Sequence, residues 1–141
     1  MIRKANISDL PVLTALALKL WPDNGPEELA AELTEIMSSR KAAFFLAEGG
    51  MGFAQCQLRN DYVEGTESSP VGYLEGIFVE ETHRGRGIAR QLLAACENWA
   101  REKGCREFAS DCELDNEGSL AFHLNMGFQE VSRIICFTNK L

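Results

Sequence analysis

Two spacings of apolar residues alternate along the chain, and together they predict its secondary structure. Continuous or alternating apolar runs bounded by glycine, proline or asparagine predict short strands, whereas apolar residues at every third or fourth position predict helices. Strands are expected over residues 2–6, 42–48, 52–60, 72–79, 105–111, 128–131 and 134–138. Helices are expected to end before Trp21, near Ser39, before Gly104 and before Gly127. The order βααβββαβαββ predicts an α/β fold with one mixed sheet and helices on both faces.

The most informative stretch is the turn between the strand at 72–79 and the helix that follows it. Gly85 and Gly87 permit positive φ and a close approach of the backbone to a ligand. The amides of the first helical turn have no partner within the helix, and Arg84 and Arg86 add positive charge beside them. Such a turn suits a phosphate or pyrophosphate, and the alternative is an ordinary strand-to-helix turn with solvated arginines.

The spacing of these residues narrows the class of phosphate ligand. It lacks the Gly-Lys-Ser/Thr end of a P-loop and the third glycine of a dinucleotide fingerprint. Arg84, Gly87 and Ala89 resemble the Arg/Gln-x-x-Gly-x-Gly/Ala signature of the GCN5-related acetyltransferases. Residues 116–128 are similar to a second signature of that family, a helix opened by Asn that ends in an aromatic pair and Gly-Phe. The resemblance implies the family's fold and acetyl-coenzyme A as co-substrate, with its pyrophosphate on this loop.

Length, charge and cysteine content exclude several classes of protein. A chain of 141 residues is expected to form one N-acetyltransferase domain over residues 1–141, with a core of its own. The five cysteines are scattered without metal-ligand spacing, so we expect reduced core residues, a cytoplasmic protein and no metal site. No stretch approaches the ~20 apolar residues that cross a bilayer. The net charge of −7 argues against a nucleic-acid surface and favours small cationic partners.

Blocks outside the coenzyme signature resemble aminoglycoside 6'-N-acetyltransferases of the short bacterial type. They span nearly the whole chain and comprise residues 20–22, 61–65, 68–71, 74–79 and 104–111. This resemblance implies direct transfer of acetyl to the 6'-amine in a ternary complex, by an enzyme that is a homodimer like its relatives. It implies that the aminoglycoside is faced by Trp21, Tyr62, Glu75 and Asp111. It also implies that the coenzyme is bound by Ile77, Phe78, Val79, Arg84, Gly85, Arg86, Gly87, Ile88, Ala89 and Asn116.

The residue types in the implied substrate site suit a cationic amine. Carboxylates balance ammonium charge, and aromatic rings offer cation–π contacts or cover the apolar faces of sugars. Glu75 is expected to accept the proton that the attacking ammonium loses, and Asp111 to anchor charge. Each residue also has a structural alternative: Trp21 as a staple at a helix end, Tyr62 as a loop anchor, Glu75 as a solvent-facing strand residue and Asp111 as a turn cap.

Two positions depart from the resemblance. His123, which we expect beside the coenzyme, stands where the wider family commonly has a tyrosine proposed as general acid for the departing thiolate. Ser132, which we expect at the substrate, stands where the aminoglycoside enzymes have a glutamate, with Glu130 nearby. These departures leave open an acetyltransferase for another amine, such as a polyamine or a peptide terminus. Outside enzymes, a non-catalytic module that binds acetyl-coenzyme A is the alternative.

Overall fold

The strands form one sheet whose order, β1-β2-β3-β4-β5, follows the order along the chain. A computed structural model describes all residues, 1–141. Neighbouring strands are antiparallel from β1 to β4, whereas β5 pairs with β4 in parallel. The strands are β1 (Ile2–Lys4), β2 (Ala42–Ala47), β3 (Gly52–Arg59), β4 (Val71–Val79) and β5 (Phe108–Ser110).

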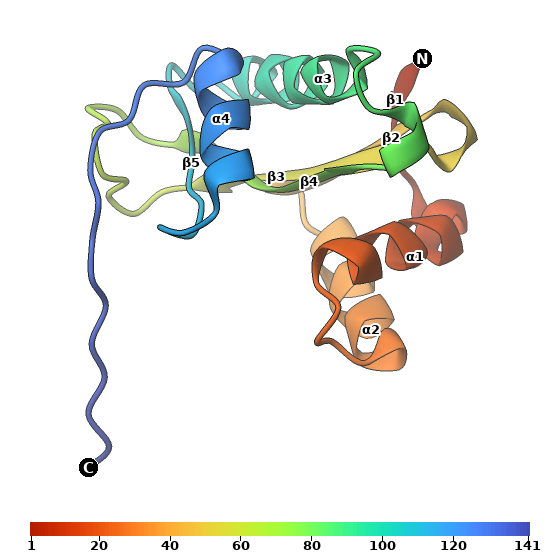
Figure 1. The fold of residues 1–141 in the computed structure, drawn as a ribbon, viewed down its shortest axis with the longest axis horizontal. Coiled ribbons are helices and arrows are strands. Elements are labelled where there is room, and N and C mark those ends of the chain that lie inside the picture. Colours follow the sequence, from red (N-terminus) through yellow and green to blue (C-terminus); the bar gives the residue numbers. More distant parts are fainter.

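Helices cover both faces of the sheet, which confirms the predicted α/β architecture. Short 3-10 turns occur at Ile7–Asp9, Glu48–Gly50 and Glu81–His83, and the helices are α1 (Leu10–Leu20), α2 (Pro26–Met37), α3 (Ile88–Glu102) and α4 (Glu117–Asn125). In Figure 1, α3 lies on one face, α1 and α2 lie on the other, and α4 follows β5 at the far edge. None of these helices combines the length and the apolar character needed to cross a membrane.

The two faces of the sheet have separate apolar cores because side chains alternate along each strand. The core beneath α3 includes Ala54, Cys56, Leu74, Leu92 and Trp99, all buried. The core beneath α1 and α2 includes Leu13, Leu33, Phe44, Leu46 and Phe53. Because α1 and α2 are short, they cover only part of their face (Figure 1), and Arg59 at the end of β3 and Glu75 within β4 lie outside that core.

The prediction of two closing strands is wrong for this chain on its own. Residues 129–141 contain no strand, and the segment extends away from the body of the protein (Figure 1). Its large apolar side chains Val131, Ile134, Ile135 and Phe137 are between 60% and 88% exposed. A strand requires partners for its backbone N–H and C=O groups, and these residues find none within one copy.

Candidate functional site

The loop that leads into α3 presents a row of free backbone amides. Gly85 and Gly87 have φ angles of 79° and 78°, in the left-handed region that favours glycine. Gly87 immediately precedes α3, and no side chain caps this end of the helix. The N–H groups of residues 85–90 make no hydrogen bond within the chain. Successive free donors at a helix N-terminus suit an anion with several oxygens, such as a pyrophosphate.

The two arginines of this loop have different surroundings. Nε of Arg84 donates a hydrogen bond of 2.8 Å to the carbonyl oxygen of Val79, and the guanidinium lies 5.5 Å from the ring centroid of Phe78. Arg84 therefore ties the loop to the end of β4. Arg86 is exposed and forms no ion pair, so its whole guanidinium is free for a phosphate.

A bulge in β4 sets the position of Glu75. The pairing register passes from Gly76 to Leu74 between two consecutive residues of β3, so Glu75 has no partner on that strand. An extra residue of this kind bends the strand and re-aims its own side chain. Glu75 is consequently half-buried at the margin of the uncovered part of the sheet rather than a regular solvent-facing residue.

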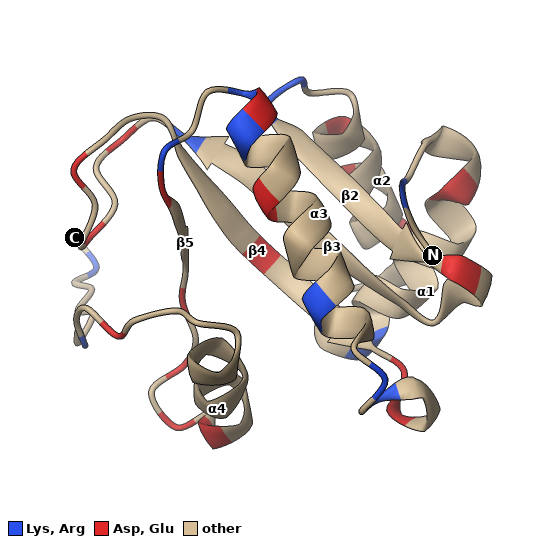
Figure 2. Cartoon of the chain, turned by 90° about the horizontal axis from the view of Figure 1, so that it is seen from above, with Lys and Arg blue, Asp and Glu red and all other residues tan.

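β5 separates from β4 immediately before this bulge. The parallel pairing runs from Gly72 with Phe108 to Leu74 with Ser110 and then ends. Figure 2 shows the two strands diverging, with α4 beyond the wider end of the opening. The edge of residues 75–79 that faces β5 thus has no strand beside it, and it can pair with an extended ligand in the manner of an added strand.

Arg59, Tyr73, Glu75 and Asp111 form a continuous polar chain at this end of the sheet, the Arg59 cluster. Nε and Nη2 of Arg59 donate to the two carboxylate oxygens of Glu75 at 3.1 and 2.9 Å. The guanidinium carbon of Arg59 lies 3.5 Å from the ring centroid of Tyr73. The Tyr73 hydroxyl donates a hydrogen bond to Asp111. The cluster therefore joins the two carboxylates that the sequence singled out.

Partial burial strengthens the interactions of the Arg59 cluster. The side chains of Glu75 and Arg59 are 17% and 39% exposed, so their two-pronged ion pair is screened less than a surface pair. Hydrogen bonding to Glu75 raises the pKa of Arg59, which stays charged. Burial, and secondly the bond to Asp111, raises the pKa of Tyr73. Tyr73 thus remains a neutral donor to Asp111 at physiological pH.

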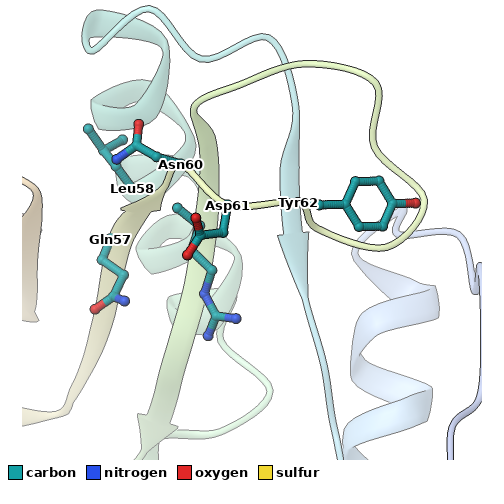
Figure 3. A pocket seen from close by; sticks show the side chains of 6 residues that line it. Gln57, Leu58, Asn60, Asp61 and Tyr62 are labelled. Carbon is teal, nitrogen blue, oxygen red and sulfur yellow. The ribbon is translucent and has the colours of Figure 1, made fainter.

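A pocket of about 420 Å³ opens beside the cluster and is lined by residues 57–62. Its charged residues are Arg59 and Asp61. In Figure 3 the side chains of Gln57 and Asp61 lie on the same side, whereas Tyr62 extends away from them along its loop. Tyr62 is 76% exposed, so its ring is available to a ligand and does not anchor the loop in the core. Pockets of this volume hold small ligands.

The loop between β3 and β4 is attached to the strand edge by one carboxylate. Oε1 of Glu107, just before β5, accepts hydrogen bonds from the Glu67 backbone N–H and from the Ser68 hydroxyl. The bond from Ser68, followed by the one from Glu67, lowers the pKa of Glu107. Earlier in the same loop, Gly65 lies against the side chain of Val131, since a Cβ at Gly65 would come within 2.6 Å of it. These contacts hold the loop that carries Tyr62.

Trp21 has both a packing role and a place beside the site. It follows α1, and its ring packs edge-on against Phe53 with centroids 6.1 Å apart. The ring also covers Gly76, where an added Cβ would lie 2.6 Å from it. Trp21 therefore packs the end of α1 against the sheet and lies next to Gly76, the residue that follows Glu75. Its ring is half-buried, which leaves part of it for contact with a ligand.

Asn116 and His123 hold α4 in place. The Asn116 side chain accepts from the backbone N–H of Ser119, so it caps the helix as predicted. Nδ1 of His123 lies 2.7 Å from the Ser119 carbonyl oxygen, which can only accept, and Nε2 lies 2.8 Å from the Ser110 hydroxyl. These contacts assign the proton to Nδ1 and leave Nε2 as acceptor from Ser110. Both ring nitrogens of His123 are therefore already engaged within the chain.

Ser132 is not brought to the Arg59 cluster in a single chain. It is exposed in the segment after α4 and makes no hydrogen bond. Its neighbours Glu130 and Arg133 form an ion pair with each other at 2.8 Å. Several acidic residues lie on the loops around β5 and one at the start of α4 (Figure 2).

Sequence reasoning did not identify Arg59 and Tyr73 as site residues. Arg59 ends a strand and directly precedes the loop that carries Tyr62, and this position was the available signal. Tyr73 offered none, because its hydroxyl and ring acquire their partners only through the pairing of β3, β4 and β5.

Comparisons with known proteins identify the family of this chain. Residues 10–128 match the model of the acetyltransferase (GNAT) family. The chain belongs to this family. The acetyltransferase is 43% identical to an aminoglycoside N(6')-acetyltransferase type 1 of Stenotrophomonas maltophilia, over 99% of this chain and 93% of the relative. The corresponding protein of Serratia marcescens is 40% identical, over 100% of this chain and 99% of the relative.

Solved structures extend the similarity to three dimensions. AAC(6')-Iy in complex with the bisubstrate analogue CoA-S-monomethyl-acetylneamine matches this acetyltransferase with a TM-score of 0.94 and 40% identity, over 100% of this chain and 98% of that one. The apo structure of AAC(6')-Ig from Acinetobacter haemolyticus matches with a TM-score of 0.94 and 36% identity, over 100% of this chain and 99% of that one.

We expect Gly87→Val to abolish tight binding of coenzyme A by this acetyltransferase. A valine at φ of 78° both strains the loop and places a side chain where the backbone approaches phosphate. The loss of charge-assisted hydrogen bonds is expected to cost at least about 2 kcal/mol, or roughly 30-fold in Kd by calorimetry.

Gly104→Val is the matched control. Gly104 has φ of 90°, follows the other end of α3 and also has open space around it. The control should lose similar stability but keep its coenzyme affinity. Unchanged affinity in a folded Gly87→Val, or equal losses in both variants, would show that the loop does not bind the coenzyme.

Proposed function

We propose that this acetyltransferase moves the acetyl group of acetyl-coenzyme A to the 6'-amine of aminoglycosides and so inactivates these antibiotics. The Arg59 cluster carries the proposal. It places two carboxylates and an aromatic face at the open end of the sheet, next to the bulge where the coenzyme edge of β4 begins. Such a site favours a ligand with several ammonium groups on rigid rings, and the relatives at about 40% identity are named for this reaction.

Glu75 is the proposed proton acceptor. An ammonium cannot attack a thioester, so it must lose a proton before or during bond formation. Each carboxylate oxygen of Glu75 accepts one hydrogen bond from Arg59 and retains a further lone pair. The substrate ammonium can therefore donate to Glu75, directly or through a water, while Arg59 holds the carboxylate in place. Asp111, oriented by Tyr73, anchors a second ammonium.

The remaining steps need little from side chains. The amine attacks the thioester carbon, and a backbone N–H on the open edge of β4 near Phe78 or Val79 stabilises the oxyanion. Collapse of the tetrahedral intermediate expels the thiolate of coenzyme A, whose pKa near ~8.5 allows departure without a strong acid. The second proton of the attacking nitrogen leaves as the amide forms and passes to the thiolate or to water. His123 is dispensable in this scheme because both its ring nitrogens are engaged by Ser119 and Ser110.

Direct attack in a ternary complex fits the placement of the cysteines. Cys56, Cys96 and Cys105 are buried. Hydrogen bonding to Cys56, and then burial, raises the pKa of Cys96, and burial raises that of Cys105. Thiols in such surroundings are poor nucleophiles, so none of these three is proposed to carry the acetyl group. Cys112 and Cys136 are exposed, and the proposed direct transfer uses neither. Free thiols and the use of acetyl-coenzyme A are consistent with action in the cytoplasm.

A homodimer is part of the proposal because the C-terminal segment has the pattern of a strand without a partner. Its apolar side chains from Val131 to Phe137 are exposed, and β5 presents an unpaired edge on the side away from β4. We infer that this segment forms strands against a second copy, where its apolar residues are buried. Pairing between copies would also bring Ser132 close to a substrate pocket.

The proposed reaction is tested by release of free thiol from acetyl-coenzyme A with a matched pair of aminoglycosides. Neomycin B carries a 6'-amine, and paromomycin has a hydroxyl at that position. We expect turnover with neomycin B that exceeds turnover with paromomycin by at least ~10²-fold, because a hydroxyl is a far poorer nucleophile. Equal rates with both compounds would contradict 6' transfer, and no rate with any amine would favour a non-catalytic coenzyme-binding module.

Three variants separate the proposed roles in steady-state kinetics. Glu75→Gln should lower kcat by ~10²-fold or more because it removes the proton acceptor, whereas Asp111→Asn should chiefly raise KM for the aminoglycoside. His123→Phe, which preserves the ring's volume, should lower kcat by less than ~10-fold. If Glu75→Gln keeps a kcat near that of the wild type while His123→Phe loses most of its activity, the proton acceptor is His123 rather than Glu75.

The dimer is tested by sedimentation of the full chain. The wild type should sediment at twice its 15.6 kDa chain mass. Ile135→Glu should weaken association by at least about 2 kcal/mol, or roughly 30-fold in Kd, because a buried isoleucine is replaced by a charge. Asn139→Glu adds the same charge to the same segment at a polar position and should remain dimeric. A monomeric wild type would refute the proposed pairing of the C-terminal segment with a second copy.

A further inference from the structure

Arg59 is a positive charge within a site that should attract cations. It lines the 420 Å³ pocket together with Asp61, and no other basic residue lines that pocket. Its two-pronged bond to Glu75 and its stacking on Tyr73 fix the guanidinium, which neutralises one of the two carboxylates of the cluster. The Arg59 guanidinium would be unfavourable in a site whose only function is to bind cations, because it repels the ammonium groups of the ligand where screening is weak.

The orientation of the guanidinium leaves part of it free. Nε and Nη2 face Glu75, whereas Nη1 makes no hydrogen bond within the chain. A guanidinium can only donate, so whatever lies against Nη1 must be an acceptor. Sugar hydroxyl and ring oxygens are acceptors of this kind. A linear polyamine consists of ammonium groups and methylenes and offers no hydrogen-bond acceptor. Its only interaction with the Arg59 guanidinium is therefore electrostatic repulsion.

We propose that Arg59 is a specificity-determining residue that selects amines on oxygen-bearing rings over acceptor-free polyamines. The inference rests on the proposed aminoglycoside reaction and adds a residue that distinguishes its substrates from other cations. Arg59 donates from Nη1 to a hydroxyl or ring oxygen of the bound aminoglycoside while Glu75 and Asp111 receive its ammonium groups. The same guanidinium repels a polyamine that would otherwise bind the two carboxylates.

Binding and turnover of kanamycin A and spermidine by the full-length protein with coenzyme present test this selection. In Arg59→Met, which keeps an apolar stem of similar length, we expect the ratio of kcat/KM for kanamycin A to that for spermidine to fall by about 10-fold or more. The ratio of Kd for kanamycin A to Kd for spermidine, measured by calorimetry, should rise correspondingly. Arg59→Lys keeps the charge but not the planar fork, so kanamycin A should bind more weakly while spermidine binding is unchanged.

The control is Arg40→Met, which removes an exposed arginine outside the site and changes the net charge equally. It should leave both ratios as in the wild type. The inference is overturned if Arg59→Met leaves the two ratios unchanged. An equal fall in kcat/KM for both substrates is such a result, and it is what the loss of a residue that merely positions Glu75 would give. It is also overturned if the wild type binds spermidine as tightly as kanamycin A.

Failure of the proposed function is seen separately. It appears as absent turnover of kanamycin A by the wild type, whatever the binding ratio. Even then, the ratio of the two Kd values measured by calorimetry reports on the role of Arg59, because binding is measured without acetyl transfer. If Arg59→Met does not fold, Arg59→Lys still decides, since weakened binding of kanamycin A alone is the result expected from loss of the fork.

Discussion

β4 must satisfy two different neighbours, and it does so by carrying one residue more than β3 at Glu75. On one side it continues a regular antiparallel sheet, and on the other it pairs with β5 for only three residues before the strands separate. Both irregularities fall at the same point. The bulge turns Glu75 toward the uncovered part of the sheet, and the separation frees the backbone edge of residues 75–79. In the proposed function, the coenzyme side and the substrate side of the site consequently meet at a single residue.

Electrostatic balance at this point comes from the strand ends. A half-buried carboxylate is costly unless it is paired, and Arg59 provides that pairing without occupying all of the lone pairs of Glu75. Tyr73 links the same arginine to Asp111 through its ring face and its hydroxyl. Each member of the cluster therefore limits the rotamers of the next, which gives a rigid site on strand ends rather than on mobile loops.

The sequence predicted those features that depend on neighbouring residues. Gly85 and Gly87 have positive φ, and Asn116 caps α4, because backbone conformation and capping are local properties. The mixed sheet with helices on both faces was likewise predictable from apolar periodicity. The pairing of Arg59 with Glu75 was not, because these residues are 16 positions apart in sequence and meet only through a register shift between β3 and β4. The closing strands were predicted from alternation alone, which shows that a segment is suited to pairing but not where its partner lies.

The attachment of the β3–β4 loop has a consequence for how chains of this architecture diversify. The loop that carries Tyr62 is held from outside the core, by Glu107 on one flank and by Val131 against Gly65 on the other. The coenzyme loop, in contrast, is continuous with α3, whose inner face fills the main core. Under the proposed function, we expect substitutions or length changes in the β3–β4 loop to alter the recognition of the acceptor amine with little effect on folding or on coenzyme binding. In an evolving population exposed to new drugs, substrate range is the property that such a chain can change first.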